Sequence, residues 1–217
     1  MGMDHAKVMA AALGPVMAAL RRYEACLGDA GERAGPPLTG AMGTAPRRRA
    51  TQRWCRAALL DDAVSADAFL RPAARICVAE PTFRRQVLAL RALFARRSAV
   101  RRCIDRASLA AMAAAVGGNA VLTRLRGAAA EDGETRLPLP LALDPDTLAR
   151  DGLLRLMAGE PAAAMLATLA GYAGVPAADA PVGQAEVGRT EGDHTEVDRA
   201  ENARFFQRLP HWMPERP

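Results

Sequence analysis

The sequence predicts an all-α fold, and three observations predict it. Aromatic residues make up only 4% of the chain, so an apolar core must come mainly from Ala, Leu, Val and Met, of which Ala is the strongest helix former. Residues that favour strands are sparse, and no segment alternates apolar and polar residues with a period of two. Several segments instead repeat apolar residues at helical spacing and begin at a proline. We therefore expect an irregular multi-helix globular domain with a flexible acidic linker and a short C-terminal segment.

The helical domain is predicted to span residues 1–174. Its first helix covers residues 3–27, where one apolar face recurs at helical spacing. That face consists of Leu13, Met17, Leu20, Tyr23 and Leu27. A loop rich in Gly and Pro follows at about residues 28–46, and residues 47–60 are expected to form a second helix. Ser65 is the expected N-cap of a short helix that ends before Pro72.

The clearest predicted helix begins at Glu80-Pro81, because proline at the first helical position has no hydrogen-bond donor to lose. At about 100° per residue, one arc of this helix is apolar, with Phe83, Val87, Leu90, Leu93 and Phe94. The opposite arc carries Arg84, Arg85, Arg91 and Arg96, with Leu88 among them. This pattern indicates an amphipathic helix with a basic outer face exposed to solvent.

Arginine is unusually dense in the segment from Arg84 to Arg106. This segment contains eight arginines and one acidic residue. Three interpretations are open: a solvated helix face, a surface for an acidic protein partner, or a nucleic-acid surface. Stacking aromatic residues are absent from the basic face, which argues against binding of single-stranded nucleic acid. We expect protein binding, with Arg84, Arg85, Arg91 and Arg96 as the contacting residues.

Further helices are expected after this one. Asp105 is the expected cap of a helix that ends at Gly117-Gly118, and Asn119 the cap of a short helix over residues 120–126. The buried stripe of the first is expected to be Leu109, Met112, Ala113 and Val116. Residues 127–143 form a predicted connector. Helices then restart at Asp144-Pro145 and at Glu160-Pro161.

The stretch from Leu109 to Gly127 superficially resembles a helix-turn-helix. Its second helix has the wrong phase for that motif, because Thr123 and Arg126 would be buried in place of the apolar residues Val121, Leu122 and Leu125. A small DNA-binding regulator is therefore kept only as the alternative function.

The chain changes character after residue 174. Residues 175–201 contain seven acidic residues, two arginines and few large apolar groups, which predicts a disordered linker. Residues 202–217 concentrate Phe205, Phe206 and Trp212 and are predicted to be a C-terminal docking segment.

Residue patterns typical of catalysis are missing. The three histidines, His5, His194 and His211, lie in terminal or linker segments, and the four cysteines are widely spaced. Lys7 is the only lysine, so the Gly-rich loop cannot be a nucleotide-binding P-loop. We expect no catalytic, cofactor-binding or metal-binding residues, and no membrane span or signal peptide. The sequence therefore predicts a protein that is not an enzyme.

Several segments resemble a known protein family. They are Ala74-Arg75-Ile76-Cys77, the leucine- and arginine-rich stretch from Phe83 to Phe94, Ala99 to Asp105, Leu109 to Gly117, and the Arg-Arg-Tyr-Glu sequence around Tyr23. These segments resemble the accessory proteins of type III secretion systems that include YscK/SctK and its Hrp-cluster counterparts.

The resemblance implies a role in virulence-associated protein transport without catalysis. Members of that family belong to the sorting platform beneath the injectisome, at the cytoplasmic face of the bacterial inner membrane. The implied partners are the SctQ-type C-ring/pod protein and the cytoplasmic domain of the SctD-type inner-membrane ring protein. The implied function is an adaptor that links the two, with no cofactor and no nucleic acid, held at the membrane by protein contacts.

Overall fold

The computed structural model describes residues 14–29, 49–50, 64–128, 137–157, 160 and 191–214. Every regular element within these ranges is a helix, which confirms the all-α prediction for the part of the chain that is described. The chain divides into two compact units. Unit 1 comprises Met1–Ala79 and Pro161–Gly174, and unit 2 comprises Glu80–Glu160 and Val175–Pro217. Within unit 2, the C-terminal helix packs with the segment that begins at Glu80.

In unit 1, residues 14–29 form a helix whose buried face is Val16, Ala19, Tyr23 and Leu27. Tyr23 and Leu27 were predicted to be buried, but Met17 is 49% exposed, so the buried stripe lies one residue earlier there. The ring of Tyr23 packs against that of Phe69, with centroids 5.5 Å apart. The predicted helical residues 3–13, and all but residues 49–50 of the predicted helix over 47–60, lie outside the described residues.

Two short helices follow one another between residues 66 and 77 of unit 1. The 3₁₀ helix η1 (Ala66–Leu70) begins at Ser65, whose hydroxyl accepts a hydrogen bond from the backbone N–H of Asp67 at 3.2 Å, as predicted. Helix α3 (Pro72–Cys77) follows, with proline in its first turn.

Helix α4 (Pro81–Ala95) is the centre of unit 2. It begins where the sequence predicts, because the carboxylate of Glu80 accepts hydrogen bonds from the backbone N–H groups of Thr82 and Phe83 at 2.8 and 2.9 Å. Every residue from 87 to 95 is buried, on both arcs of the helix. The prediction of an amphipathic helix with a solvent-exposed basic face is therefore wrong.

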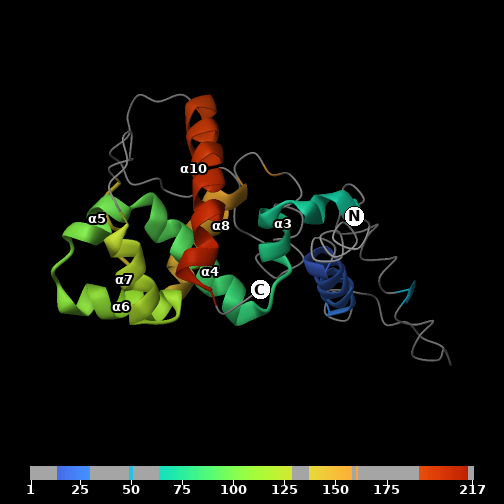
Figure 1. Cartoon of the computed structure of the whole chain (residues 1–217), viewed down its shortest axis with the longest axis horizontal. Coiled ribbons are helices and arrows are strands. Elements are labelled where there is room, and N and C mark those ends of the chain that lie inside the picture. The colour runs from blue at the N-terminus through green and yellow to red at the C-terminus, as the bar shows by residue number, and fades with distance from the viewer. Residues whose placement is uncertain are drawn as a thin grey trace, which may run out of the picture. The chain divides into compact units, whose positions relative to one another are not determined.

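Two helices cover the face of α4 that was expected to meet solvent. They are α8 (Pro145–Met157), which packs extensively along α4, and α10 (Glu191–Trp212). Figure 1 shows α10 lying across α4 and α8 within unit 2. The side chain of Asp144 caps α8 by accepting hydrogen bonds from the N–H groups of Asp146 and Thr147 at 3.1 and 2.9 Å, so the predicted helix start is confirmed.

A glycine allows α8 to approach α4 closely. A Cβ at Gly152 would overlap the backbone carbonyl oxygen of Leu88 and lie 3.2 Å from the backbone nitrogen of Ala92. The two helices can therefore touch backbone to backbone only because residue 152 has no side chain.

The other helices described in unit 2 are α5 (Arg97–Arg102), α6 (Arg106–Val116) and α7 (Asn119–Gly127). Asp105 caps α6 as predicted, and Gly117 ends it in the left-handed conformation, with φ of 90°. Met112, Ala113 and Val116 are buried as predicted, while Leu109 is half-buried. The cap of α7 is Gly118, and Asn119 is already its first helical residue, so Asn119 is not the cap that the sequence predicted.

No single helix of the described residues is long and apolar enough to cross a membrane. Only α6 and α7 taken together have sufficient length and apolar character, and they are bent by 106° at their break.

The predicted disordered linker over residues 175–201 is wrong for its last part. Residues 175–190 lie outside the described residues, but from Glu191 onward the chain is helical and continues as α10 to Trp212. Glu201 is buried in unit 2 although it is charged. Composition predicted disorder because acidic residues were assumed to be solvated, whereas here arginines of other helices pair with them.

Candidate functional site

Unit 2 contains a buried network of arginines and carboxylates that joins α4, α5 and α8 to α10. Its central side chain is Arg91 of α4, which is 0% exposed. Its Nε donates to Oδ1 of Asn202 at 2.6 Å, its Nη2 to Oδ1 of Asp198 at 3.1 Å, and its Nη1 lies 3.5 Å from Oε2 of Glu201. All three partners belong to α10, so Arg91 connects α4 to α10 by several charge-assisted contacts.

Glu201 of α10 joins a second arginine to the network. Nη1 of Arg97, the first residue of α5, donates to Oε1 of Glu201 and to the backbone carbonyl of Phe94, both at 2.9 Å. The Arg97 guanidinium also lies 4.3 Å from the centre of the Phe94 ring, which is cation–π geometry. One carboxylate therefore pairs with two buried arginines from different helices.

Asp151 of α8 extends the network at its other end. Nη1 and Nη2 of Arg96 donate hydrogen bonds to the two oxygens of this carboxylate, at 2.6 and 3.1 Å. Nε of Arg155 donates to it at 3.2 Å. Arg155 also lies 3.5 Å from Asp198. Because Asp198 contacts Arg91 as well, the ion pairs form one continuous set from Arg96 to Glu201.

Burial and pairing shift the pKa values of three members. Burial lowers the pKa of the Arg91 guanidinium, and the charges of Asp198 and Glu201 offset this only in part. For Asp151, burial acts to raise the pKa, but the hydrogen bond from Arg96 and the charge of Arg155 outweigh it and hold the pKa below its usual value. Burial likewise opposes the charge of Arg155, but Asp151 and Asp198 raise its pKa overall.

An aromatic cluster continues the contact between α10 and α4. The Phe94 ring of α4 lies 5.7 Å from that of Phe205 and 5.3 Å from that of Trp212, measured between centroids. Phe205 and Trp212 are both buried within unit 2. The predicted C-terminal docking segment therefore docks on this chain's own helix α4.

The four arginines predicted to bind a partner lie in different environments. Arg91 is enclosed in the network, Arg84 is buried, and the side chain of Arg96 is mostly buried against Asp151. Only Arg85 is exposed, with 54% of its side chain accessible and an ion pair to Asp146. The prediction that these four arginines form one exposed surface is therefore wrong, because three of the four side chains lie inside unit 2.

The sequence analysis missed several members of this network, namely Arg97, Arg155, Asp151, Asp198, Glu201 and Asn202. One signal in the sequence pointed to three of them, Arg97, Asp198 and Glu201. The arginine-rich stretch from Arg84 to Arg106 and the acidic stretch over 175–201 have complementary charge, and such segments attract each other when both are desolvated. We infer that this network serves to attach the helices of unit 2 to one another.

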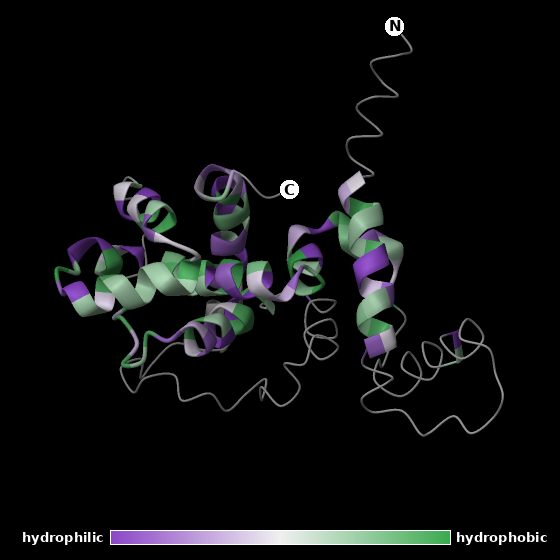
Figure 2. Ribbon diagram, turned by 90° about the horizontal axis from the view of Figure 1, so that it is seen from below, coloured by the Kyte–Doolittle hydropathy of each residue, from purple (hydrophilic) through white to green (hydrophobic). Residues whose placement is uncertain are grey.

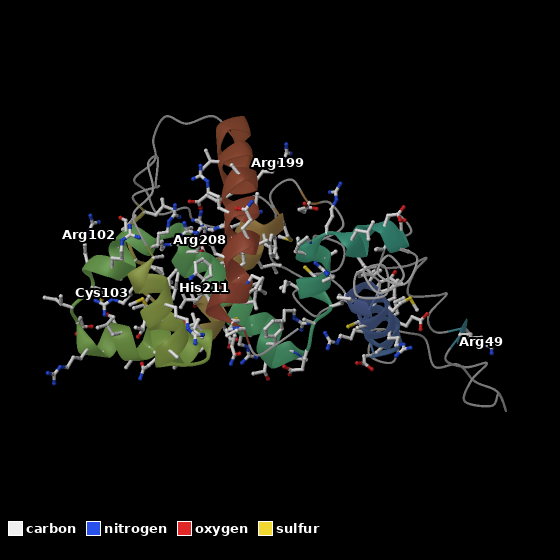
Figure 3. The ribbon with its side chains drawn as sticks, in the orientation of Figure 1. Arg49, Arg102, Cys103, Arg199, Arg208 and His211 are labelled. Carbon is white, nitrogen blue, oxygen red and sulfur yellow. The ribbon has the colours of Figure 1, made fainter. Side chains whose placement is uncertain are left out.

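The described residues hold few features typical of small-molecule chemistry. They contain no group of three or more His, Cys, Asp or Glu residues that could hold a metal ion. One shallow pocket of about 330 Å³ lies between α7 and α10, lined by Arg124, Gly127, Ala128, Gln207, Arg208, His211 and Trp212. Figure 3 shows Arg208 and His211 on α10, beside this pocket.

The arginines of α7 bear on the helix-turn-helix alternative. The 106° bend between α6 and α7 suits such a motif, and Leu122 and Leu125 are buried where the apolar pattern placed them. Nη1 of Arg124, however, donates to the backbone carbonyl of Trp212 at 2.9 Å, and Arg126 donates to that of Cys103 at 3.1 Å. Both arginines are therefore engaged at the C-terminal ends of neighbouring helices.

Acid is expected to loosen unit 2 through Asp151. A carboxyl whose pKa is lowered by folding stabilises the folded state fully above the unfolded-state pKa of about 3.9. This stabilisation is lost as the pH falls through the lower pKa of the folded state. In urea unfolding at a series of pH values from 6 to 3, the midpoint urea concentration should fall with pH. Below about pH 4 this midpoint should depend less steeply on pH in Asp151→Asn than in wild type. The same slope in both proteins would remove Asp151 as a source of acid sensitivity.

Comparisons with known proteins identify the family. The model of a bacterial type III secretion protein family, HrpB4, matches residues 5–215 of the chain. No match was found among curated proteins or among solved structures. Because the match spans both units almost from end to end, the chain belongs to the HrpB4 family of bacterial type III secretion proteins.

Proposed function

We propose that this secretion protein is a non-enzymatic adaptor of the apparatus. It binds the cytoplasmic domain of the SctD-type inner-membrane ring protein on one side and the SctQ-type C-ring/pod protein on the other. It works at the cytoplasmic face of the inner membrane, within the sorting platform, and is held there by these protein contacts.

The observation that carries the proposal is the match of residues 5–215 to a type III secretion family. The architecture of unit 2 supports it. An internal set of ion pairs and aromatic contacts fixes α10 to α4 and α8, which makes a rigid helical scaffold. A rigid scaffold presents surfaces to other proteins with little loss of conformational entropy on binding.

The adaptor role predicts a ternary complex. The full chain, the purified pod protein and the purified cytoplasmic domain of the ring protein are mixed in pairs and all together, then separated by size-exclusion chromatography with light scattering. We expect each pair with the chain to associate, and all three proteins to co-elute. The pod and ring proteins mixed without the chain serve as the control. Association of the chain with neither protein would contradict the proposal, and association with only one would reduce the chain to a single-partner subunit.

A further inference from the structure

The corner between α5 and α6, formed by residues 101–106, presents an apolar side chain to solvent. Ile104 is 89% exposed, although isoleucine is among the residues most often buried. A single exposed apolar residue is ordinary on a protein surface. Two further features distinguish Ile104: the backbone around it is fixed, and arginines surround it.

Hydrogen bonds fix the backbone on both sides of Ile104. The backbone N–H of Cys103 donates to the carbonyl of Val100 at 3.3 Å, and Nη2 of Arg126 donates to the carbonyl of Cys103 at 3.1 Å. On the other side, the carboxylate of Asp105 accepts a hydrogen bond from the backbone N–H of Ser108 at 2.8 Å. The backbone of Ile104 is therefore fixed between Cys103 and Asp105, with its side chain in solvent. Little conformational entropy remains to be lost when this side chain is bound.

The surroundings of Ile104 are basic. Arg102 and Arg106 are exposed, and the side chain of Arg126 reaches the same corner by donating to the backbone carbonyls of Arg101 and Cys103. Within residues 101–106 the one carboxylate is that of Asp105, which is already used to cap α6. Figure 3 shows Arg102 and Cys103 on the side of unit 2 away from α10.

The first turns of α6 leave room around the corner. The exposed residues that follow Arg106 are Ala107 and Ala110, whose side chains are small. Ile104 is therefore the bulky apolar group that projects from this part of unit 2. Figure 2 shows the link between α5 and α6 as a short hydrophobic stretch bounded by hydrophilic ribbon.

We propose that the α5–α6 corner is a docking site for a protein partner. The partner's complementary surface is an apolar pocket that receives Ile104, bordered by carboxylates that face Arg102 and Arg106. An apolar anchor filling a pocket, surrounded by charged residues, is the usual arrangement of a binding hot spot. An anionic membrane fits less well, because a membrane-binding helix needs a continuous apolar face, and here alanines follow the single isoleucine.

This inference rests on the proposed function for the identity of the partner, and one set of variants tests it. Ile104→Asp and Ile104→Ser remove the anchor, and Arg102→Glu with Arg106→Glu reverses the charge. Leu141→Asp is the matched apolar control, because Leu141 is also fully exposed in a loop of unit 2. Arg150→Glu with Arg199→Glu is the matched charge control, because both arginines are exposed elsewhere in unit 2. Thermal melts of the full chain should be the same for all variants, since the changed side chains are at the surface.

Binding is measured against three probes: the purified pod protein, the purified cytoplasmic domain of the ring protein, and vesicles containing phosphatidylglycerol. We expect the two Ile104 variants to bind at least one protein probe about tenfold or more weakly, as loss of a buried anchor does. The charge reversal should slow association and reduce its salt dependence. Both control variants should bind within about twofold of wild type, well short of that hot-spot loss. Unchanged protein binding by Ile104→Asp would overturn the inference and leave the adaptor role intact.

A secretion assay separates failure of the inference from failure of the proposed function. If the wild-type chain binds neither protein probe, the adaptor role fails. Secretion by cells that carry only a variant then tests whether the α5–α6 corner is a docking site. Loss of secretion with Ile104→Asp but not with Leu141→Asp, at equal protein levels, supports docking to another component. Full secretion with Ile104→Asp overturns the inference. Ile104-dependent binding to vesicles without protein binding would also overturn it, in favour of a membrane contact.

Discussion

Replacing Arg91 with leucine is expected to destabilise unit 2 by about 3–5 kcal/mol, the usual cost of breaking a buried ion pair from one side. The Arg91 side chain is wholly buried and contacts Asp198, Glu201 and Asn202 of α10. Leucine would leave these acceptors next to apolar atoms, and two of them, Glu201 and Asn202, are buried. Glu201 would keep Arg97 as a partner, and Asp198 would keep the more distant Arg155. The remaining pairs limit the loss but do not replace the three contacts.

The measurement is urea unfolding of the full chain, combined with hydrogen exchange of peptides from α10. Arg85→Leu is the matched control, because Arg85 is on the same helix but 54% exposed, and its ion pair to Asp146 is worth about 0–1 kcal/mol. Arg91→Leu should lower the midpoint and speed exchange in α10, and Arg85→Leu should do neither. Equal effects of the two substitutions would contradict the structural role assigned to the network.

A double substitution tests whether the cost comes from orphaned charge. Asp198→Asn should destabilise the wild type more than it destabilises Arg91→Leu, because in the variant the carboxylate has already lost its nearest partner. The two effects should therefore not add. Additive effects would mean that Arg91 and Asp198 contribute independently.

Local signals in the sequence predicted where helices begin and end. Ser65, Glu80, Asp105 and Asp144 each precede a helix, and each side chain accepts a hydrogen bond from that helix's first turn. The glycine pair at residues 117–118 ends α6 as expected. These features depend on residues within three or four positions of each other, so they can be recognised without knowledge of the tertiary structure.

The buried face of α4 could not be predicted in the same way. Its arginines recur on one arc, and a basic arc ordinarily faces water. The partners of Arg91 lie more than 100 residues later in the chain, in a segment whose composition predicts disorder. Leu88, which lies within the basic arc and is buried against α8, was the one local sign that the arc is covered.

The docking surface proposed from the structure differs from the one predicted from the sequence for the same reason. The sequence placed it on α4, where Arg84, Arg91 and Arg96 are in fact internal. Two exposed arginines of the same basic stretch, Arg102 and Arg106, lie at its far end beside Ile104. Arginine density alone does not separate arginines that pair inside the protein from those that face a partner, because burial depends on which distant segment returns to pack there.

Gly152→Ala is expected to destabilise unit 2 by at least the upper end of the range of about 1–3 kcal/mol that overpacking costs. The added Cβ would overlap the carbonyl oxygen of Leu88 and lie 2.7 Å from its carbonyl carbon. These are backbone atoms of the central helix, so no side chain can rotate away to make room. Helix α8 would have to move off α4, and the contacts of Asp151 with Arg96 would lengthen with it.

Helix propensity alone predicts the opposite sign for Gly152→Ala, which makes the test decisive. Alanine in place of glycine inside a helix stabilises by about 1 kcal/mol when there is space for it. Gly127, at the end of α7, has no atom within 4 Å of where its Cβ would lie, so Gly127→Ala is the control and should be neutral or slightly stabilising. Thermal and urea unfolding of both variants measure the contrast. A stable Gly152→Ala protein, with hydrogen exchange in α8 as slow as in wild type, would mean that α4 and α8 are not in backbone contact.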